Sequence, residues 1–493
     1  MFEEIFGIFK QRPALTTSIL TLVIATLVNL GIERTESKKK NTIAFIVALI
    51  ALIITESLLI IMPLDSIDKK SAFYVFDNFA RFFSVFAIFV TIAILVAVKY
   101  YSTELPEVPA FYSLITGTAI GLILLPSAVD LLSIFVAWEL LSVPLYAMVA
   151  YSHNWSRSTE GAVKYYVMGT ASSAILALGI GLTGAIMGTT NLYLLPDRFN
   201  EIVMDQFSLI VMGIAIVGLV GGFGVKITLV PLHQWAPDTY EGSMPPITAY
   251  LSGTIKAIRL SAPLRVFMVL APIAMYDISV YLAILSFLTM TYANIVALKQ
   301  ERVYRMMAYS SISQVGYIVI GLVAAVVNSS VADIALTATI FYALAFAIME
   351  VAVFIAIGVI MRYIGLYTID DYNGLASKYP GVAIILGCGL LSLVGIPPFV
   401  GFAGKIYLFI AALKADILWL AIALAINSAI SIGYYGLVVK RMFLEAPSEK
   451  IKEAKIPALF MAILWILTIA IIGLGVYPFI IEKYASIAAT ELI

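Results

Sequence analysis

Long apolar runs separated by short polar segments repeat along the whole chain. A helix that crosses a lipid bilayer needs roughly 20 apolar residues, and the sequence contains about fourteen stretches of that kind. They lie at residues 14–33, 42–64, 74–98, 109–126, 128–150, 162–188, 207–230, 246–270, 276–298, 303–327, 332–361, 381–413, 416–439 and 456–482. The pattern predicts an all-α transmembrane protein of about 14 helices, with both ends of the chain on one side of the membrane.

The composition supports a protein surrounded by lipid. Apolar residues make up 62% of the chain and charged residues 12%, which is not the composition of a soluble protein. Thirty basic residues balance thirty acidic ones, and no basic run resembles an arm that binds nucleic acid. The first apolar stretch lacks a small-residue cleavage site, so we expect a permanent helix and no signal peptide. No loop is long enough to fold separately, so function is expected inside the membrane region.

Basic residues in the loops predict the orientation. One side carries Arg34, Lys38, Lys39, Lys40, Lys99, Arg157, Lys299, Arg302, Arg305, Arg362, Lys378, Lys440, Arg441, Lys450, Lys452 and Lys455. The other side carries about half as many, namely Lys10, Arg12, Lys69, Lys70, Arg198, Lys414 and Lys483. Because basic loops stay in the cytoplasm, we expect the first side to be cytoplasmic and both termini to be extracytoplasmic.

The sequence contains an internal repeat with an offset of five helices. The letters G-F-G-V-K at 222–226 match G-F-A-G-K at 401–405, and A-W-E-L-L-S at 137–142 can be laid over A-Y-S-S-I-S at 308–313. Tyr146 then falls over Tyr317. Since five is odd, the two copies must run in opposite directions, as in the inverted repeats of many ion transporters.

Ionisable side chains within the predicted helices are the candidates for function, because a charge in the bilayer needs a partner, a wet cavity or a role. Lys226 follows three glycines and precedes Pro231, and Lys405 follows Pro397 and Pro398. Their helices, the seventh and the twelfth, can therefore be broken beside the lysines, which is a pointer to an intramembrane ion site. The alternative for either lysine is to snorkel to an interface.

Glu139 lies in the middle of the fifth predicted helix and is the natural partner for Lys226. At an assumed separation of about 7 Å the two charges would attract by roughly 2.4 kcal/mol. Such a pair could act as a proton switch, although a carboxyl group that is merely hydrogen-bonded within the bundle fits the same position.

Four further residues are weaker candidates. Lys256 is deep in the eighth helix, and Glu350 is deep in the eleventh without an assigned partner. Lys164 could simply pair with Glu160 four residues earlier. His233 could pass protons near neutral pH, but a single loop histidine is more often only a hydrogen-bond donor. One cysteine, Cys388, and two histidines cannot build an iron–sulfur cluster, so we expect no redox cofactor in this chain.

The motifs resemble a known family. The run K-I-T-L-V-P-L-H-Q-W-A-P-D-T-Y-E-G at 226–242, followed by P-P-I-T-A-Y-L-S-G-T-I-K at 245–256, closely resembles the antiporter-like subunits of respiratory complex I. It looks most like the N-type subunit. W-E-L at 138–140, Y-S-S-I-S-Q at 309–314 and G-I-P-P at 395–398 also fit, so that the likeness extends over helices 4 to 13.

The resemblance implies fourteen helices with two inverted five-helix repeats, helices 4–8 and 9–13, and broken helices 7 and 12. The domain organisation expected from it is 1–105, 106–272, 273–445 and 446–493, namely helices 1–3, the two repeats and helix 14. It implies proton-transfer roles for Glu139, Lys164, Lys226, Lys256 and Lys405, with Lys164 as the helix-6 lysine that partners the carboxylate. Glu350 departs from the Lys or His that related subunits often carry in helix 11.

The resemblance also implies the partner subunits and the cellular location of the protein. Other membrane subunits, including further antiporter-like ones, would surround the chain in the plasma membrane of a prokaryote, and iron–sulfur clusters and quinone or other carriers would belong to partner subunits. The same fold serves multisubunit sodium/proton antiporters, membrane-bound hydrogenases, sulfur reductases and methanogen dehydrogenases. A redox-driven proton pump, a sodium/proton exchanger and a structural spacer are therefore the three functions to compare.

Overall fold

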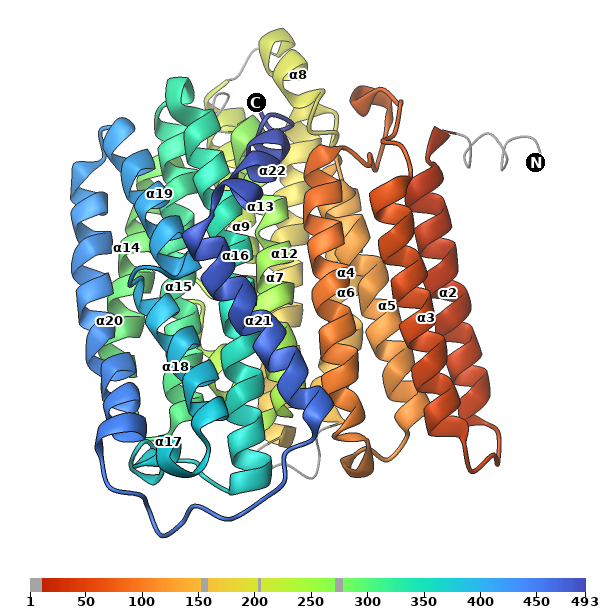
Figure 1. Ribbon diagram of the computed structural model, residues 1–493. Helices are drawn as coiled ribbons and strands as arrows, with labels where there is room; N and C mark the ends of the chain where they lie inside the picture. The colour runs from red at the N-terminus through yellow and green to blue at the C-terminus, as the bar shows by residue number, and fades with distance from the viewer. Residues whose placement is uncertain (1–10, 152–157, 203–204, 271–277) are drawn as a thin grey trace.

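The computed structural model describes residues 11–151, 158–202, 205–270 and 278–493, and its described part is a bundle of helices without a β-sheet (Figure 1). Lys10, Arg157 and one of the two histidines, His153, lie outside the described residues. Twelve of the described helices are long and apolar enough to cross a membrane. They are α2 (Pro13–Glu33), α3 (Lys40–Ile61), α4 (Asn78–Lys99), α5 (Val108–Ser127), α6 (Leu131–Ala150), α7 (Ser158–Met187), α9 (Gln206–Lys226), α14 (Ile278–Ala297), α15 (Val303–Val327), α16 (Ala332–Val359), α20 (Leu418–Leu444) and α21 (Ala458–Val476).

Two further crossings are made of shorter pieces. One consists of α11 (Pro245–Ala249), a π-helical turn (Tyr250–Ile255), α12 (Lys256–Arg259) and α13 (Ser261–Leu270). The other consists of α18 (Pro380–Val394) and α19 (Val400–Lys414). With these two crossings, the all-α transmembrane fold of about fourteen helices is confirmed.

Both predicted helix breaks are present, but on opposite sides of their lysines. α9 ends at Lys226, and Thr228 has a left-handed backbone with φ of 68° before the short helix α10 (Trp235–Gly242) begins. α18 ends at Gly395, whose φ of 90° favours glycine, so the second break precedes Lys405. The predicted seventh helix, 207–230, therefore extends too far, because the chain leaves the helix at residue 227.

The last predicted span, 456–482, is also divided. α21 ends at Val476, and Pro478 precedes α22 (Phe479–Ala489). A proline disfavours helical backbone in the residue before it, which accounts for the interruption. The chain is short between these elements, so α22 packs back onto α16 and α4.

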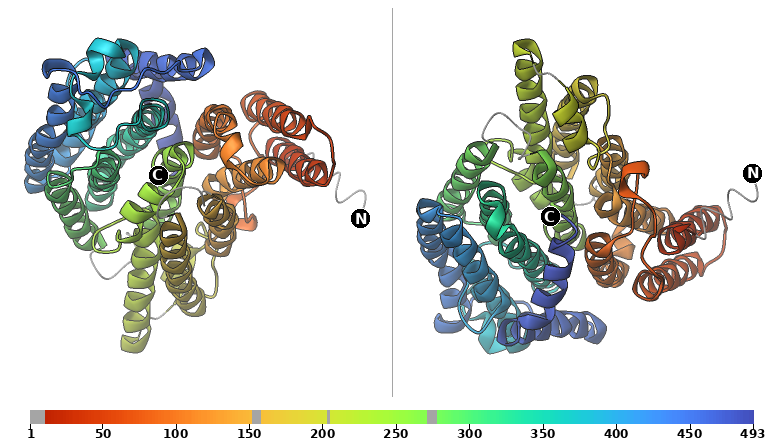
Figure 2. Two further views of the ribbon diagram at one scale, coloured as in Figure 1. Left: turned by 90° about the horizontal axis from the view of Figure 1, so that it is seen from below. Right: turned by 90° about the horizontal axis from the view of Figure 1, so that it is seen from above.

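α16 lies at the centre of the bundle, because its membrane-spanning part is completely buried within this one chain. Seen along the bundle axis, α2 and α3 form one edge and α20 the opposite edge (Figure 2). α21 crosses the front of the bundle obliquely (Figure 1). α2 begins and α22 ends at the same end of the bundle, as an even number of crossings requires.

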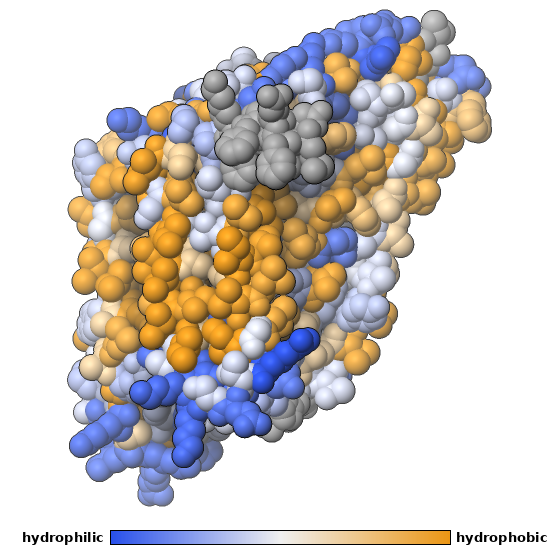
Figure 3. All heavy atoms as spheres, turned by 90° about the vertical axis from the view of Figure 1, so that its right-hand side faces the viewer, coloured by the Kyte–Doolittle hydropathy of each residue, from blue (hydrophilic) through white to orange (hydrophobic). Residues whose placement is uncertain are grey.

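The outer surface matches a bilayer. On the side formed by α2 and α3, a broad hydrophobic band separates two hydrophilic ends (Figure 3). Exposed leucines and isoleucines such as Leu27, Ile50 and Ile61 supply this band. Arg34, Lys38 and Lys39 lie in the loop at one end of the same two helices, and Lys40 begins α3.

Candidate functional site

Glu139 and Lys226 form a direct ion pair in the interior of the membrane region. The Nζ atom of Lys226 lies 2.7 Å from Oε1 of Glu139, much closer than the 7 Å assumed from the sequence. Lys226 is almost fully buried, whereas 28% of the Glu139 side chain is exposed. Ser173 of α7 also donates to Glu139, at 2.5 Å. The pair therefore joins three helices, α6, α7 and α9.

Close packing of α7 against α9 holds Lys226 at this position. A Cβ atom on Gly222 would lie 2.6 Å from Cβ and 2.8 Å from Cα of Leu176, so only glycine permits this approach. The hydroxyl of Ser172 donates to the Gly222 carbonyl at 2.7 Å. The glycine-rich end of α9 thus sets the helix contact as well as the break.

A second cation lies beside this pair. Arg259 of α12 is 1% exposed and donates to the Ser142 hydroxyl at 3.1 Å and to the Tyr165 hydroxyl at 3.0 Å. The same Ser142 hydroxyl lies 3.4 Å from Nζ of Lys226. Ser142 therefore links the two cationic side chains.

Lys256 and Glu350 meet near the centre of the bundle. Lys256 is 2% exposed, and its Nζ donates to the Ser311 hydroxyl at 2.7 Å. Glu350 of α16 is fully buried. Lys256, Ser252 and Ser311 are the polar groups near it. Glu350, which had no assigned partner, thus shares a site with Lys256.

Hydroxyl and amide groups connect this central site to Lys405. Ser310 is hydrogen-bonded to the hydroxyl of Tyr435, and the Gln314 amide donates to the same hydroxyl at 3.3 Å. Gln314 also donates to the Leu393 carbonyl at 3.2 Å. Because Lys405 binds that carbonyl too, a buried polar file runs from Ser311 and Ser310 to the end of α18.

Lys405 lies at the second helix break and binds freed backbone groups. Its Nζ donates to the carbonyls of Leu393 and Val394, at 2.8 Å and 2.9 Å, and lies 4.5 Å from the centre of the Tyr317 ring. Tyr146, the residue aligned with Tyr317 in the internal repeat, lies 3.5 Å from Nζ of Lys226. The tyrosines matched by the repeat therefore accompany the matched lysines.

Lys164 and His233 are the two remaining candidates, and their surroundings differ from those of the buried lysines. Lys164 does not contact Glu139: it pairs with Glu160 and Asp238, each at 2.6 Å, and its side chain is 42% exposed. It lies near the start of α7, whereas Ser173, farther along that helix, reaches Glu139. His233 is buried in the break after α9, where its ring packs against Tyr292 at 5.0 Å.

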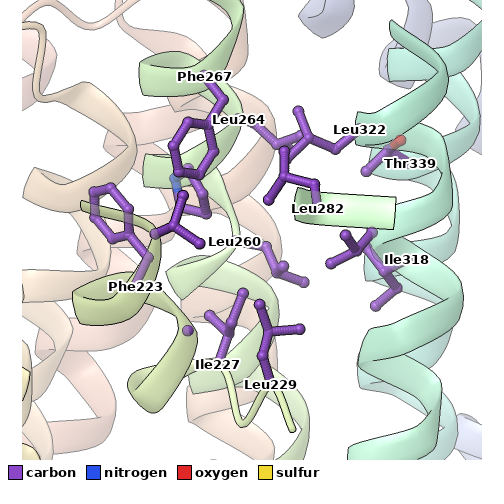
Figure 4. Close-up of a pocket in the computed structure, with 14 residues that line it drawn as sticks. Phe223, Ile227, Leu229, Leu260, Leu264, Phe267, Leu282, Ile318, Leu322 and Thr339 are labelled. Carbon is purple, nitrogen blue, oxygen red and sulfur yellow. The ribbon is translucent and has the colours of Figure 1, made fainter. Parts of the chain in front are cut away.

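An apolar cavity lies above the break in α9, toward the ends of α13 and α15 (Figure 4). Its volume is about 20 Å³, and its lining is apolar apart from Thr339. A buried water needs two or more polar partners, so this cavity does not offer water a site. Apart from the Thr339 hydroxyl, this cavity therefore adds no polar group to those around Lys226.

Sequence reasoning did not identify Arg259, Ser142, Gln314 or Tyr435. Arg259 could have been found, because it follows Lys256 by three residues and must share its helix face. The neutral residues gave no such signal, since serine and tyrosine are common in transmembrane helices and the sequence does not show which helices face each other.

Broken helices beside buried lysines define a membrane transporter of the type in which ions bind at discontinuous helices. The family model described as NADH:quinone oxidoreductase/Mrp antiporter, TM matches residues 128–431, and the chain belongs to this family.

Named relatives and a solved structure agree with this assignment. The chain is 34% identical to NADH-quinone oxidoreductase subunit N of Desulfitobacterium hafniense, over 85% of this chain and 86% of that protein. It is 32% identical to F(420)H(2) dehydrogenase subunit N of Methanosarcina mazei, over 85% and 84%. Its fold matches a chain of the membrane-bound sulfane sulfur reductase, an archaeal respiratory complex, with a TM-score of 0.83, 22% identity and 97% coverage of both chains.

Proposed function

We propose that this chain is a proton-translocating membrane subunit of a redox-driven, ion-pumping complex, of the N type in complex I. The observation that carries the proposal is two groups of buried polar side chains on either side of Arg259, one around the Glu139–Lys226 pair and the other leading from Lys256 and Glu350 to Lys405. Groups able to gain and lose protons in a membrane interior typically mark a proton pathway. The names of the two relatives, both N subunits of dehydrogenases, support the redox-driven version.

The proposed path is lateral. A proton held at Lys226 passes to Lys256 and Glu350, then along Ser310, Tyr435 and Gln314 to Lys405, from which it leaves the membrane.

The attraction within the Glu139–Lys226 pair is large enough for the pair to act as a proton switch. Two unit charges 4 Å apart attract by about 4 kcal/mol at an effective dielectric constant of 20, and the 2.7 Å contact of Glu139 with Lys226 is at least that close. Moving one charge against 100 mV costs about 2.3 kcal/mol. Opening and closing this ion pair thus involves enough free energy to drive one proton.

Glu139 is the residue through which partner subunits would act. More than a quarter of its side chain is exposed at mid-helix, on a face of α6 that also exposes Val136 and Val143. A carboxylate facing acyl chains is costly, so a neighbouring membrane subunit should cover it. The redox carriers belong to partner subunits in this proposal, because an iron–sulfur cluster needs several thiolates and Cys388 is the chain's only cysteine. The chain thus works within a translocating oxidoreductase and is not its redox catalyst.

In this proposal, Lys164 and His233 take part in proton entry. Lys164, in its ion pairs with Glu160 and Asp238, and His233, in the break, lie where protons could enter from the loop side. The proposed setting is the cell membrane of a prokaryote, with both termini extracytoplasmic.

The test is Lys226→Ala in the assembled complex, reconstituted into vesicles. We expect proton uptake per electron to fall by the share that this subunit contributes, while electron transfer with an uncoupler is retained. Lys414→Ala, at the exposed end of α19, is the control and should pump normally. Undiminished pumping in Lys226→Ala rejects the proposal.

Two other functions are separated by related measurements. Proton movement driven by an imposed sodium gradient without a redox donor would identify an exchanger, as the family description allows. Normal pumping after combined replacement of Glu139 and Lys405 would identify a structural spacer.

A further inference from the structure

Arg259 is a buried cation without an anion of its own. Its guanidinium contacts two hydroxyls and, at 3.4 Å, the main-chain carbonyl of Lys226. No carboxylate lies within ion-pair distance of it in the part of the chain that the structure describes, and its Nε has no partner there. Buried guanidinium groups are normally paired with carboxylates, because burying an unpaired charge is costly. This charge therefore needs an explanation beyond packing.

Its position is between two lysines of the proposed path. Ser142 accepts hydrogen bonds from both Arg259 and Lys226, so a single hydroxyl separates these cations. Lys256 precedes Arg259 by three residues on one helix, which places their side chains on the same face. The charged and titratable groups facing the guanidinium from the surrounding helices are Glu139 and Tyr146 of α6, Tyr165 of α7, Lys226 of α9, Tyr240 of α10 and Lys256 of α12, with Glu350 of α16 beyond Lys256.

A guanidinium cannot serve as a proton carrier in this path, because it does not release its proton at accessible pH. It can act on carriers, since like charges repel and a fixed cation disfavours protonation of nearby amines. Glu139 compensates one protonated lysine, so a second protonated lysine next to Arg259 would face two positive charges.

We propose that Arg259 is a positioning residue of the relay, whose permanent charge prevents Lys226 and Lys256 from holding protons at the same time. A proton that reaches Lys226 is then passed on only when Lys256 is free to receive it. This inference rests on the proposed function. It adds a residue that sets the pH range over which Lys226 and Lys256 take up protons.

The test is the pH profile of proton uptake in vesicles that contain the assembled complex with Arg259→Gln. Glutamine can still hydrogen-bond to Ser142 and Tyr165 but has no charge. We expect the alkaline limb of the profile to move to higher pH by about one unit or more, because a unit charge a few ångströms away has an effect of that size. An Arg259→Gln profile that coincides with that of the parent overturns the inference.

Two more variants separate charge from structure. Tyr165→Phe removes one hydrogen-bond acceptor of Arg259 and leaves the charge, so its alkaline limb should not move; a shift equal to that of Arg259→Gln would mean that a lost contact is responsible and would also overturn the inference. Arg259→Met is a second uncharged variant with the same expected shift, for use if the glutamine variant does not assemble.

The failure of this inference can be told from the failure of the proposed function. Pumping that survives in Lys226→Ala rejects the proposed function as a whole. Pumping lost in Lys226→Ala, with an unshifted profile in Arg259→Gln, rejects only the role of Arg259.

Discussion

The three buried lysines differ in the groups that compensate their charge. Lys226 has the carboxylate of Glu139, Lys256 has a serine hydroxyl with Glu350 nearby, and Lys405 has two main-chain carbonyls. The internal repeat explains the last case, because Ser310 occupies the position that aligns with Glu139. The charge on Lys405 is thus compensated by dipoles rather than by an anion, which suits its place at the end of the proposed path.

Tyr435 offers a test of the path at the level of one hydroxyl. Tyr435→Phe removes the group that joins Ser310 to Gln314 and should abolish most of this subunit's share of proton uptake, because a positioned proton donor and acceptor is lost. The measurement is uptake per electron in vesicles. Tyr151→Phe is the control, because its hydroxyl donates to Glu107 outside the proposed path and its loss should leave uptake near normal. Equal rates in the two variants would contradict the proposed route.

At the scale of single residues, the sequence predicted the partners of charged side chains better than those of neutral side chains. Glu139 and Lys226 were expected to pair because each is isolated in an apolar helix, and they do. The lysine partner assigned to Glu139 from helix 6 is not in contact with it, since Lys164 is too near the start of α7. Ser173 takes that place, and a serine in an apolar helix carries no signal of what it will face.

At the scale of helices, composition located the crossings and glycine and proline located the breaks. The sequence placed the twelfth helix at 381–413 with a break at Pro397 and Pro398, and the structure has α18 and α19 on either side of these residues. It did not predict the π-helical turn at Tyr250–Ile255, in which Gly253 lies against α16. A Cβ atom on Gly253 would lie 2.9 Å from the Ala347 carbonyl oxygen, a tertiary constraint that one helix's sequence cannot show.

Two adjacent glycines in α9 allow a matched test of helix packing. Gly222→Ala should destabilise the protein by about 1–3 kcal/mol, because the new methyl group would meet the backbone of Leu176. Gly221→Ala should be neutral or stabilising by up to about 1 kcal/mol, since the nearest atom, on Ile175, is 3.6 Å away and alanine favours helix. Thermal unfolding in detergent measures both. Similar unfolding temperatures for the two variants would refute the close contact of α7 with α9.

At the scale of the whole molecule, the loop between α20 and α21 is held against the bundle. Asp371 binds Lys450 at 2.6 Å and accepts from the backbone of Thr368, while the Asn373 carbonyl accepts from Ser448 at 2.9 Å. The loop passes beneath α17 (Leu375–Lys378) on its way to α21 (Figure 1). These contacts connect the last helices to the second repeat.

The pH dependence of this loop can be predicted from Asp371. Burial alone would raise the pKa of its carboxyl group, but Lys450 and the backbone N–H groups of Thr368 and Tyr367 lower the pKa to about 2. A lowered pKa contributes stability above the usual value near 4, and this contribution is lost as pH falls from about 4 towards 2. Pepsin should therefore spare the parent loop at pH 4, cut it near pH 2, and cut Asp371→Asn at both. Asp370→Asn, at an exposed neighbour, should behave like the parent.

The partial exposure of Glu139 has a consequence for biogenesis. A newly inserted copy that has not yet met its neighbour presents part of this carboxyl group, still paired with Lys226, to the fatty-acid tails in mid-bilayer, where an uncovered charge is costly. Copies without their neighbour thus carry a penalty that is removed on docking, so the residue proposed to act in transport would also favour complete over incomplete assemblies.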